Sequence, residues 1–69
     1  MNKEIIFQIE EDIEGGFFAK ALGSSIFAQG DTMSELKLNI KDAVQFHFEA
    51  EEMPKVVRLY IVKQELMAV

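Results

Sequence analysis

Few residues of this chain belong to the types that carry catalysis. Its 69 residues include one histidine, His47, and no cysteine, and no serine, histidine and acidic residue stand at a spacing that indicates a nucleophilic triad. His47 falls on the apolar side of a predicted helix, which is typical of a histidine packed in place rather than of a general base or a ligand. We therefore expect no catalytic residue and no enzyme activity.

The other polar groups do not predict a metal, cofactor or phosphate site. Glu49, Glu51 and Glu52 are most simply a solvated helix end, and one histidine with scattered carboxylates does not make a transition-metal site. Gly15-Gly16 is not followed by the lysine and helix start that a phosphate loop requires. We expect neither a metal ion nor a cofactor.

Composition narrows the range of partners and compartments. Acidic residues outnumber basic ones by 12 to 7, for a formal net charge of −5, and the basic residues do not cluster, so direct nucleic-acid binding is not expected. An acidic surface suits a basic partner. No apolar run approaches the ~20 residues that span a membrane, and the first residues lack the pattern of a signal peptide. The absence of cysteine fits the cytoplasm, so we expect one cytoplasmic domain, residues 1–69, without membrane contact.

The first predicted strand covers residues 3–11. Apolar and polar residues alternate there, which is the pattern of a strand with one buried face. The buried set is Ile5, Phe7 and Ile9. A glycine-containing turn over residues 12–16 ends this strand.

A second strand is predicted at residues 17–22. Lys20 sets its facing, because a charged side chain does not belong in the core, so the odd-numbered residues from Phe17 join the buried face. A two-residue turn at 23–24 leads into a third strand. This turn implies two partner pairs across the hairpin: Ala19 with Ala28, and Ala21 with Ile26.

The longest predicted element is a helix that starts at Thr32 and ends near Glu51. Thr32 and Glu35 form a capping box, in which the Thr32 hydroxyl accepts from the Glu35 N–H and the Glu35 carboxylate reaches back to the Thr32 N–H. Pro54 cannot continue a helix and disfavours helical geometry at the preceding residue. The apolar side of the helix consists of Met33, Leu36, Ile40, Ala43, Val44 and His47.

A last strand is predicted at residues 56–63, with Val57, Leu59 and Ile61 facing the helix. A strand that follows a helix crossover is most simply parallel to a central strand, through a right-handed connection. The first strand is its natural neighbour. The predicted fold is therefore α+β with element order β-β-β-α-β: a four-stranded sheet of order 3-2-1-4 with one helix on one face.

The sheet face opposite the helix is too apolar for an ordinary solvated surface. Scattered exposed apolar residues are normal, but a contiguous patch indicates self-association or a partner. A short domain without cysteine also gains buried area by oligomerising, so we expect a homodimer or tetramer. The candidate oligomer or partner face comprises Ile6, Phe18, Leu22, Phe27, Phe46, Arg58, Tyr60 and Val62.

Three stretches resemble the HicB-type antitoxin family, in its short single-domain branch: residues 14–19, residues 30–36 with 39–44, and residues 53–59. The resemblance implies a truncated ribonuclease-H-like fold and assembly as a dimer or tetramer. It also implies a partner, a small basic HicA-type toxin that cleaves messenger RNA through a histidine. Longer HicB proteins carry a C-terminal DNA-binding module, and this chain stops at Val69, so we expect no such module.

Three functional hypotheses follow from these observations. The first is an antitoxin-like interaction protein that binds and masks a basic HicA-type toxin. The second is an orphan homo-oligomeric scaffold or small-ligand binding module that keeps the fold without a toxin. The third is a metal-dependent nuclease, although the acidic cluster that such enzymes use to hold metal ions is not evident.

Overall fold

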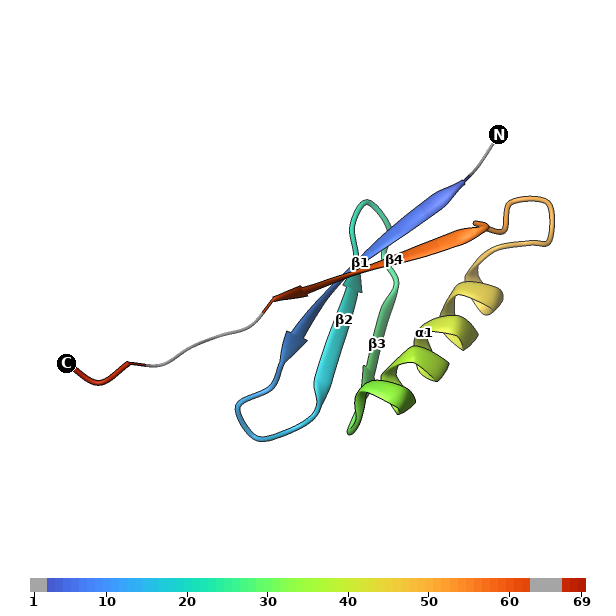
Figure 1. Ribbon diagram of the computed structural model, residues 1–69. Coiled ribbons are helices and arrows are strands. Elements are labelled where there is room, and N and C mark those ends of the chain that lie inside the picture. Colours follow the sequence, from blue (N-terminus) through green and yellow to red (C-terminus); the bar gives the residue numbers. More distant parts are fainter. Residues whose placement is uncertain (1–2, 63–66) are drawn as a thin grey trace.

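The computed structural model describes residues 3–62 and 67–69. Five elements follow one another along the chain: β1 (Glu4–Glu11), β2 (Phe17–Ala21), β3 (Phe27–Gly30), α1 (Met33–His47) and β4 (Val56–Val62). The strands form one sheet in the order β3-β2-β1-β4, with α1 on one side of it (Figure 1). The predicted class, element order and strand order are confirmed. The predicted continuation of the last strand to Lys63 lies outside the described residues.

The register of the sheet also agrees with the prediction. β1 runs antiparallel to β2 and parallel to β4. Ala19 lies opposite Ala28 in the β2–β3 hairpin, and the Ala21 N–H donates to the Ile26 carbonyl oxygen at 2.9 Å. Gly23 takes a φ of +85° in the connecting turn, a conformation that favours glycine.

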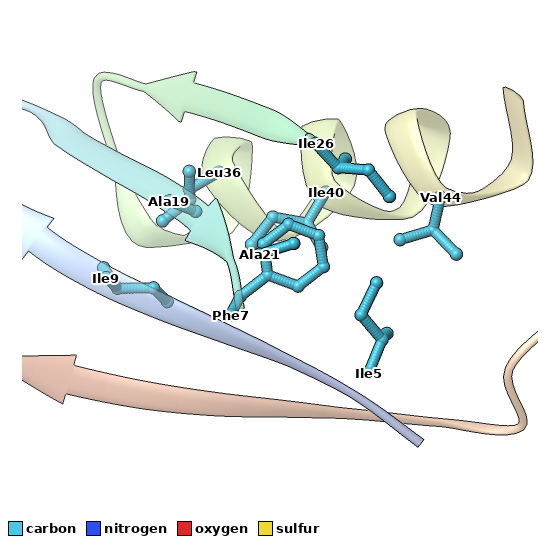
Figure 2. Packing of buried hydrophobic residues seen from close by; sticks show 9 residues of the cluster. All are labelled: Ile5, Phe7, Ile9, Ala19, Ala21, Ile26, Leu36, Ile40 and Val44. Carbon is cyan, nitrogen blue, oxygen red and sulfur yellow. The ribbon is translucent and has the colours of Figure 1, made fainter. Parts of the chain in front are cut away.

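The core lies between the sheet and α1. Phe7 of β1 sits at its centre, among small residues of β2 and apolar residues of the helix (Figure 2). The alanines of β2 leave room for α1 to approach the sheet closely. The buried set is Ile5, Phe7, Ile9, Ala19, Ala21, Ile26, Leu36, Ile40 and Val44.

The start of α1 is capped largely as predicted. The Thr32 hydroxyl accepts from the Glu35 N–H at 3.1 Å, but the Glu35 carboxylate accepts from the N–H of Asp31 at 3.3 Å rather than from Thr32. Gly30 lets the helix begin directly against the end of β3, because a Cβ at this position would lie 2.6 Å from the Leu36 backbone nitrogen.

The end of α1 differs from the prediction. The helix ends at His47, not near Glu51, and Phe48 is extended with φ −105° and ψ 142°. Phe48 packs half-buried against the core, which turns the chain out of the helix, and the acidic residues that follow oppose the negative end of the helix dipole. His47 is exposed rather than packed in the apolar sector, and its ring meets that of Phe48 edge-on at a centroid distance of 4.9 Å.

The single helix covers only part of the sheet. α1 packs over β3 and β2, so the helix-facing side chains of β4 remain partly open, with Val57 38% and Ile61 51% exposed. Val57, Leu59 and Ile61 lie on the helix side of the sheet, as predicted, but α1 does not pack over them. Among the helices that the structure describes, none has the length and apolar character needed to cross a membrane.

Candidate partner-binding face

The candidate site is the face of the sheet opposite α1, called the outer face below. Successive side chains of a strand alternate between the two faces, and the strand pairing sets the outer ones in rows across the sheet. One row is Phe27, Lys20, Gln8 and Tyr60. The row on one side of it is Gln29, Phe18, Glu10 and Val62. The row on its other side is Leu22, Ile6 and Arg58.

Three aromatic residues lie on the outer face, and two of them, Phe18 and Phe27, form a stacked pair. The rings of Phe18 and Phe27 stack with centroids 5.9 Å apart and an angle of 30° between their planes. Both remain exposed, Phe18 at 41% and Phe27 at 55%. Tyr60 lies across the sheet from them, on β4, and is 62% exposed. Rigid aromatic side chains that are already ordered by packing supply contact area at low entropic cost, and they are enriched at the centres of protein interfaces.

The outer face also carries a paired charge. Arg58 of β4 makes a salt bridge with Glu4 of β1 through its Nε and the Glu4 Oε1, and its Nη2 lies 3.5 Å from Oε2. The hydrogen bond from Arg58 holds the pKa of Glu4 below its usual range, and the same bond raises the pKa of Arg58. Since both groups are solvent-exposed, the pair orients the Arg58 side chain more than it stabilises the fold.

The structure brings together all of the predicted face residues except Phe46. Ile6 and Val62 are half-buried beside their more exposed neighbours. Phe46 is 95% exposed and belongs to α1, on the other side of the sheet, where it points away from the buried helix residues. It cannot share a flat contact surface with the outer face. The predicted patch is therefore a sheet surface plus one isolated helix residue.

Two relatives show where this chain belongs. A UPF0150 protein of Archaeoglobus fulgidus is 50% identical over 52 residues, which span 75% of this chain and 77% of the relative. A UPF0150 protein of Thermotoga maritima is 48% identical over 67 residues, which span 97% of this chain and 94% of the relative. The chain belongs to the UPF0150 family. No protein-family model and no solved structure matches it.

The turn end of this UPF0150 protein is acidic, a feature that the sequence analysis did not identify. Gly16 of the β1–β2 turn lies against the β3–α1 turn, since a Cβ there would be 3.2 Å from the Gly30 carbonyl oxygen. A polar cavity of about 530 Å³ lies between the two turns, with Asp12, Asp31 and Glu35 among its lining residues. Within residues 3–62 and 67–69, no three histidine, cysteine or acidic side chains gather closely enough to hold a metal ion. Each turn is visibly acidic in the sequence, but only the strand order places the two turns side by side.

A groove on the helix side was also not foreseen from the sequence. It has a volume of about 370 Å³ and lies between α1 and β4, where the helix leaves the sheet uncovered. Its apolar lining includes Ile40 and Val44 of the helix and Val57 and Leu59 of β4. Met53 and Pro54 also line it, and Lys37, Lys41 and Gln45 contribute polar groups. In the UPF0150 protein, apolar surface is thus open on both sides of β4.

Proposed function

We propose that this UPF0150 protein is an antitoxin-like interaction protein that binds and masks a small basic HicA-type toxin that cleaves messenger RNA. The observation that carries the proposal is the outer face, a sheet surface on which exposed aromatic and aliphatic side chains lie among polar ones. In a chain of this size such a surface is typical of a partner-binding site. The HicB-like stretches lie in the β1–β2 turn and the start of β2, at the start and in the middle of α1, and in the loop before β4 with the first half of that strand.

The charge distribution supports a basic partner. The net charge is −5, and the acidic turn end adjoins the Phe18–Phe27 pair, because Phe18 lies opposite Glu10 of β1 and lines the same cavity as Asp12 and Asp31. Acidic side chains accelerate the encounter with a basic protein, and the aromatic residues then supply most of the affinity. Inhibition would be steric: the toxin's active surface is covered, and no residue of this chain takes part in chemistry.

In this proposal the protein works in the cytoplasm as a homodimer or tetramer and does not contact nucleic acid directly. The partner is sought as a small, basic, histidine-containing open reading frame next to the gene. Co-expression should rescue cells from the toxicity of that product, and the two chains should co-purify. Absence of both rescue and co-purification would refute the proposal.

Matched variants locate the contact. Phe27→Asp places a charge on the exposed aromatic pair and should weaken capture of the toxin by about 2 kcal/mol or more, the range of an interface hot spot. Leu38→Asp is the control, since Leu38 is similarly exposed but lies on the helix. Equal capture by both variants would show that the outer face is not the binding surface.

The groove between α1 and β4 favours a second candidate function. Its volume and apolar lining fall within the range of small-molecule sites, which fits an orphan homo-oligomeric scaffold or small-ligand binding module. This alternative predicts no toxin in the gene neighbourhood. It also predicts that a hydrophobic fluorescent probe binds the purified protein and that Val57→Asp, at a groove residue that is 38% exposed, abolishes that binding, whereas Phe27→Asp does not.

A further inference from the structure

The outer edge of β4 carries backbone groups that no strand pairs. Within residues 3–62 and 67–69, β4 pairs with β1 only. The Val56 N–H donates to the Lys3 carbonyl oxygen at 3.3 Å. The backbone N–H and C=O groups of Val56 and of every second residue after it therefore point toward β1. The backbone groups of Val57, Leu59 and Ile61 therefore face outward. Unpaired groups of this kind are a template for strand addition.

The β4 edge lacks the features that normally prevent pairing. Its sequence, VVRLYIV, is seven residues long and contains no proline, glycine or lysine. Its one charged residue, Arg58, is already paired with Glu4 of the neighbouring strand. Val57 and Ile61 are partly exposed on the helix side, and Val56 and Tyr60 are exposed on the outer face. A long apolar edge in this state is a pairing site rather than a solvated rim.

The β4 sequence is complementary to itself in an antiparallel register centred on Leu59. In this register, residues whose backbone N–H and C=O groups point outward lie opposite one another and can hydrogen-bond: Leu59 lies opposite Leu59 of a second copy, and Val57 lies opposite Ile61. Arg58 falls opposite Tyr60 on the outer face, twice by symmetry, which places a guanidinium beside an aromatic ring. Within Val56–Val62 no like charges oppose each other. Shifting the centre by one residue to Arg58 would bring two arginines face to face, which is unfavourable.

We propose that two copies of this chain pair through their β4 edges, antiparallel and centred on Leu59, to form one continuous sheet. About six inter-strand hydrogen bonds would join the copies. A two-fold axis normal to the sheet leaves both helices on one side and joins both outer faces on the other, so the partner face is doubled rather than buried. The contact is at the small end of stable interfaces, and the dimer should therefore dissociate in the micromolar range.

This pairing needs no toxin, so it can fail or succeed independently of the proposed function. Sedimentation equilibrium of the purified chain, from about 1 to about 200 μM across the expected micromolar range, should show a 7.9 kDa species converting to its dimer. A monomer throughout would overturn the inference and leave the edge to a strand of another protein.

Two substitutions at one position test the register. Tyr60→Arg sets an arginine opposite Arg58 of the second copy, and Tyr60→Glu sets a carboxylate there. By symmetry each change acts twice, so the dissociation constant should rise about tenfold for the first and fall for the second. Leu38→Arg on the helix and Phe27→Asp on β3, at the opposite edge of the sheet, should leave the dissociation constant unchanged. Equal association by both Tyr60 variants would overturn the proposed register.

The absence of cysteine allows a direct geometric test. Leu59→Cys places two thiols next to the two-fold axis, within the Cα separation that a disulfide accepts, so mild oxidation should give a covalent dimer. Leu38→Cys is the exposed control and should cross-link only slowly. Similar cross-linking of the two variants would contradict pairing at β4.

Discussion

The two edges of the sheet, β3 and β4, are protected very differently. β3 is only four residues long, and α1 packs along it. Its pairing with β2 leaves the backbone groups of Gln29 facing outward, and the Asn39 side chain of α1 donates to the Gln29 carbonyl oxygen at 2.6 Å. β4 is seven residues long and has neither a helix beside it nor a side chain bound to its outer edge within the described residues.

This difference shows how a one-helix sheet distributes its protection. The helix and the shortness of β3 close one edge, and the same helix cannot also reach the other. The open edge is therefore the one where another chain can add. Substitutions on the protected β3 side should therefore change the free energy of unfolding more than substitutions on the open β4 side.

The largest loss of stability should follow a substitution in α1, the helix that covers β3 and β2. Leu36 of α1 is fully buried, so Leu36→Ala should lower the free energy of unfolding by about 2–5 kcal/mol through lost burial and the cavity left behind. Ile61→Ala, on the open side, should cost the monomer less than about 1 kcal/mol, because half of that side chain is already in water. Urea unfolding at a concentration below the dimer range measures both. If both substitutions lowered the free energy of unfolding equally, the Ile61 side chain would have to be buried in solution.

A smaller loss is expected at the junction between β3 and α1. Gly30→Ala puts a methyl group 2.6 Å from the Leu36 nitrogen, against backbone that cannot swing away, and should cost about 1–3 kcal/mol. Gly23→Ala is the comparison, since Gly23 has a positive φ but no atom within 4 Å of the new methyl group. It should cost only the backbone strain, about 1–2 kcal/mol. A Gly30→Ala melting temperature equal to that of the unaltered protein would contradict the close approach of the helix.

The hydrogen bond that closes the β3 edge should contribute less still. Asn39→Ala removes the donor to the Gln29 carbonyl oxygen and should lower the free energy of unfolding by about 0.5–1.5 kcal/mol. Gln45→Ala, also on α1 and exposed, is the control and should be near neutral. If both variants unfold at the same urea concentration, the edge does not depend on Asn39.

The smallest effect should be the response to pH on the β4 side. Hydrogen bonds from Arg58 and Lys3 lower the pKa values of Glu4 and Glu52 respectively. A carboxyl group whose pKa is lower in the folded state contributes stability above its unfolded pKa and loses it as the pH falls through the folded value. The free energy of unfolding should therefore be flat from pH 7 to about 5 and decline below about pH 4. Arg58→Met should reduce that decline, and an unchanged slope would show that the Glu4 pair is not formed in solution.

Much of the fold could be predicted because single residues settle local alternatives. Lys20 sets the facing of β2, the turn around Gly23 sets the hairpin register, and Thr32 marks the start of the helix. Such signals act within a few residues. The predicted end of α1 was wrong because glutamate and alanine, which follow Phe48, are good helix formers. The helix ends earlier because Phe48 packs against the core, and the local sequence does not reveal that contact.

The position of the helix over the sheet could not be predicted for a geometric reason. A helix about 10 Å wide covers roughly two strands spaced about 4.8 Å apart, and the alternation of apolar residues identifies the face but not which two strands. Val57 and Ile61 were therefore predicted to be core residues, although Val57 lines an open groove and Ile61 is 51% exposed. The strand residues of the predicted face lie on one side of the sheet, because that placement depends only on the alternation of side chains along each strand. Phe46 was grouped with them because the sequence shows that it is exposed but not on which side of the sheet it lies.

The parallel pairing of β1 with β4 also has a consequence for synthesis on the ribosome. β1 emerges first, and its second neighbour follows only after β2, β3 and α1 have been translated. Until then the nascent chain presents one bare side of its central strand, and contacts between segments so far apart in sequence form slowly. Protection of the unpaired β1 edge during translation, by a chaperone or by rapid elongation that shortens its exposure, should matter more for this small domain than its length suggests.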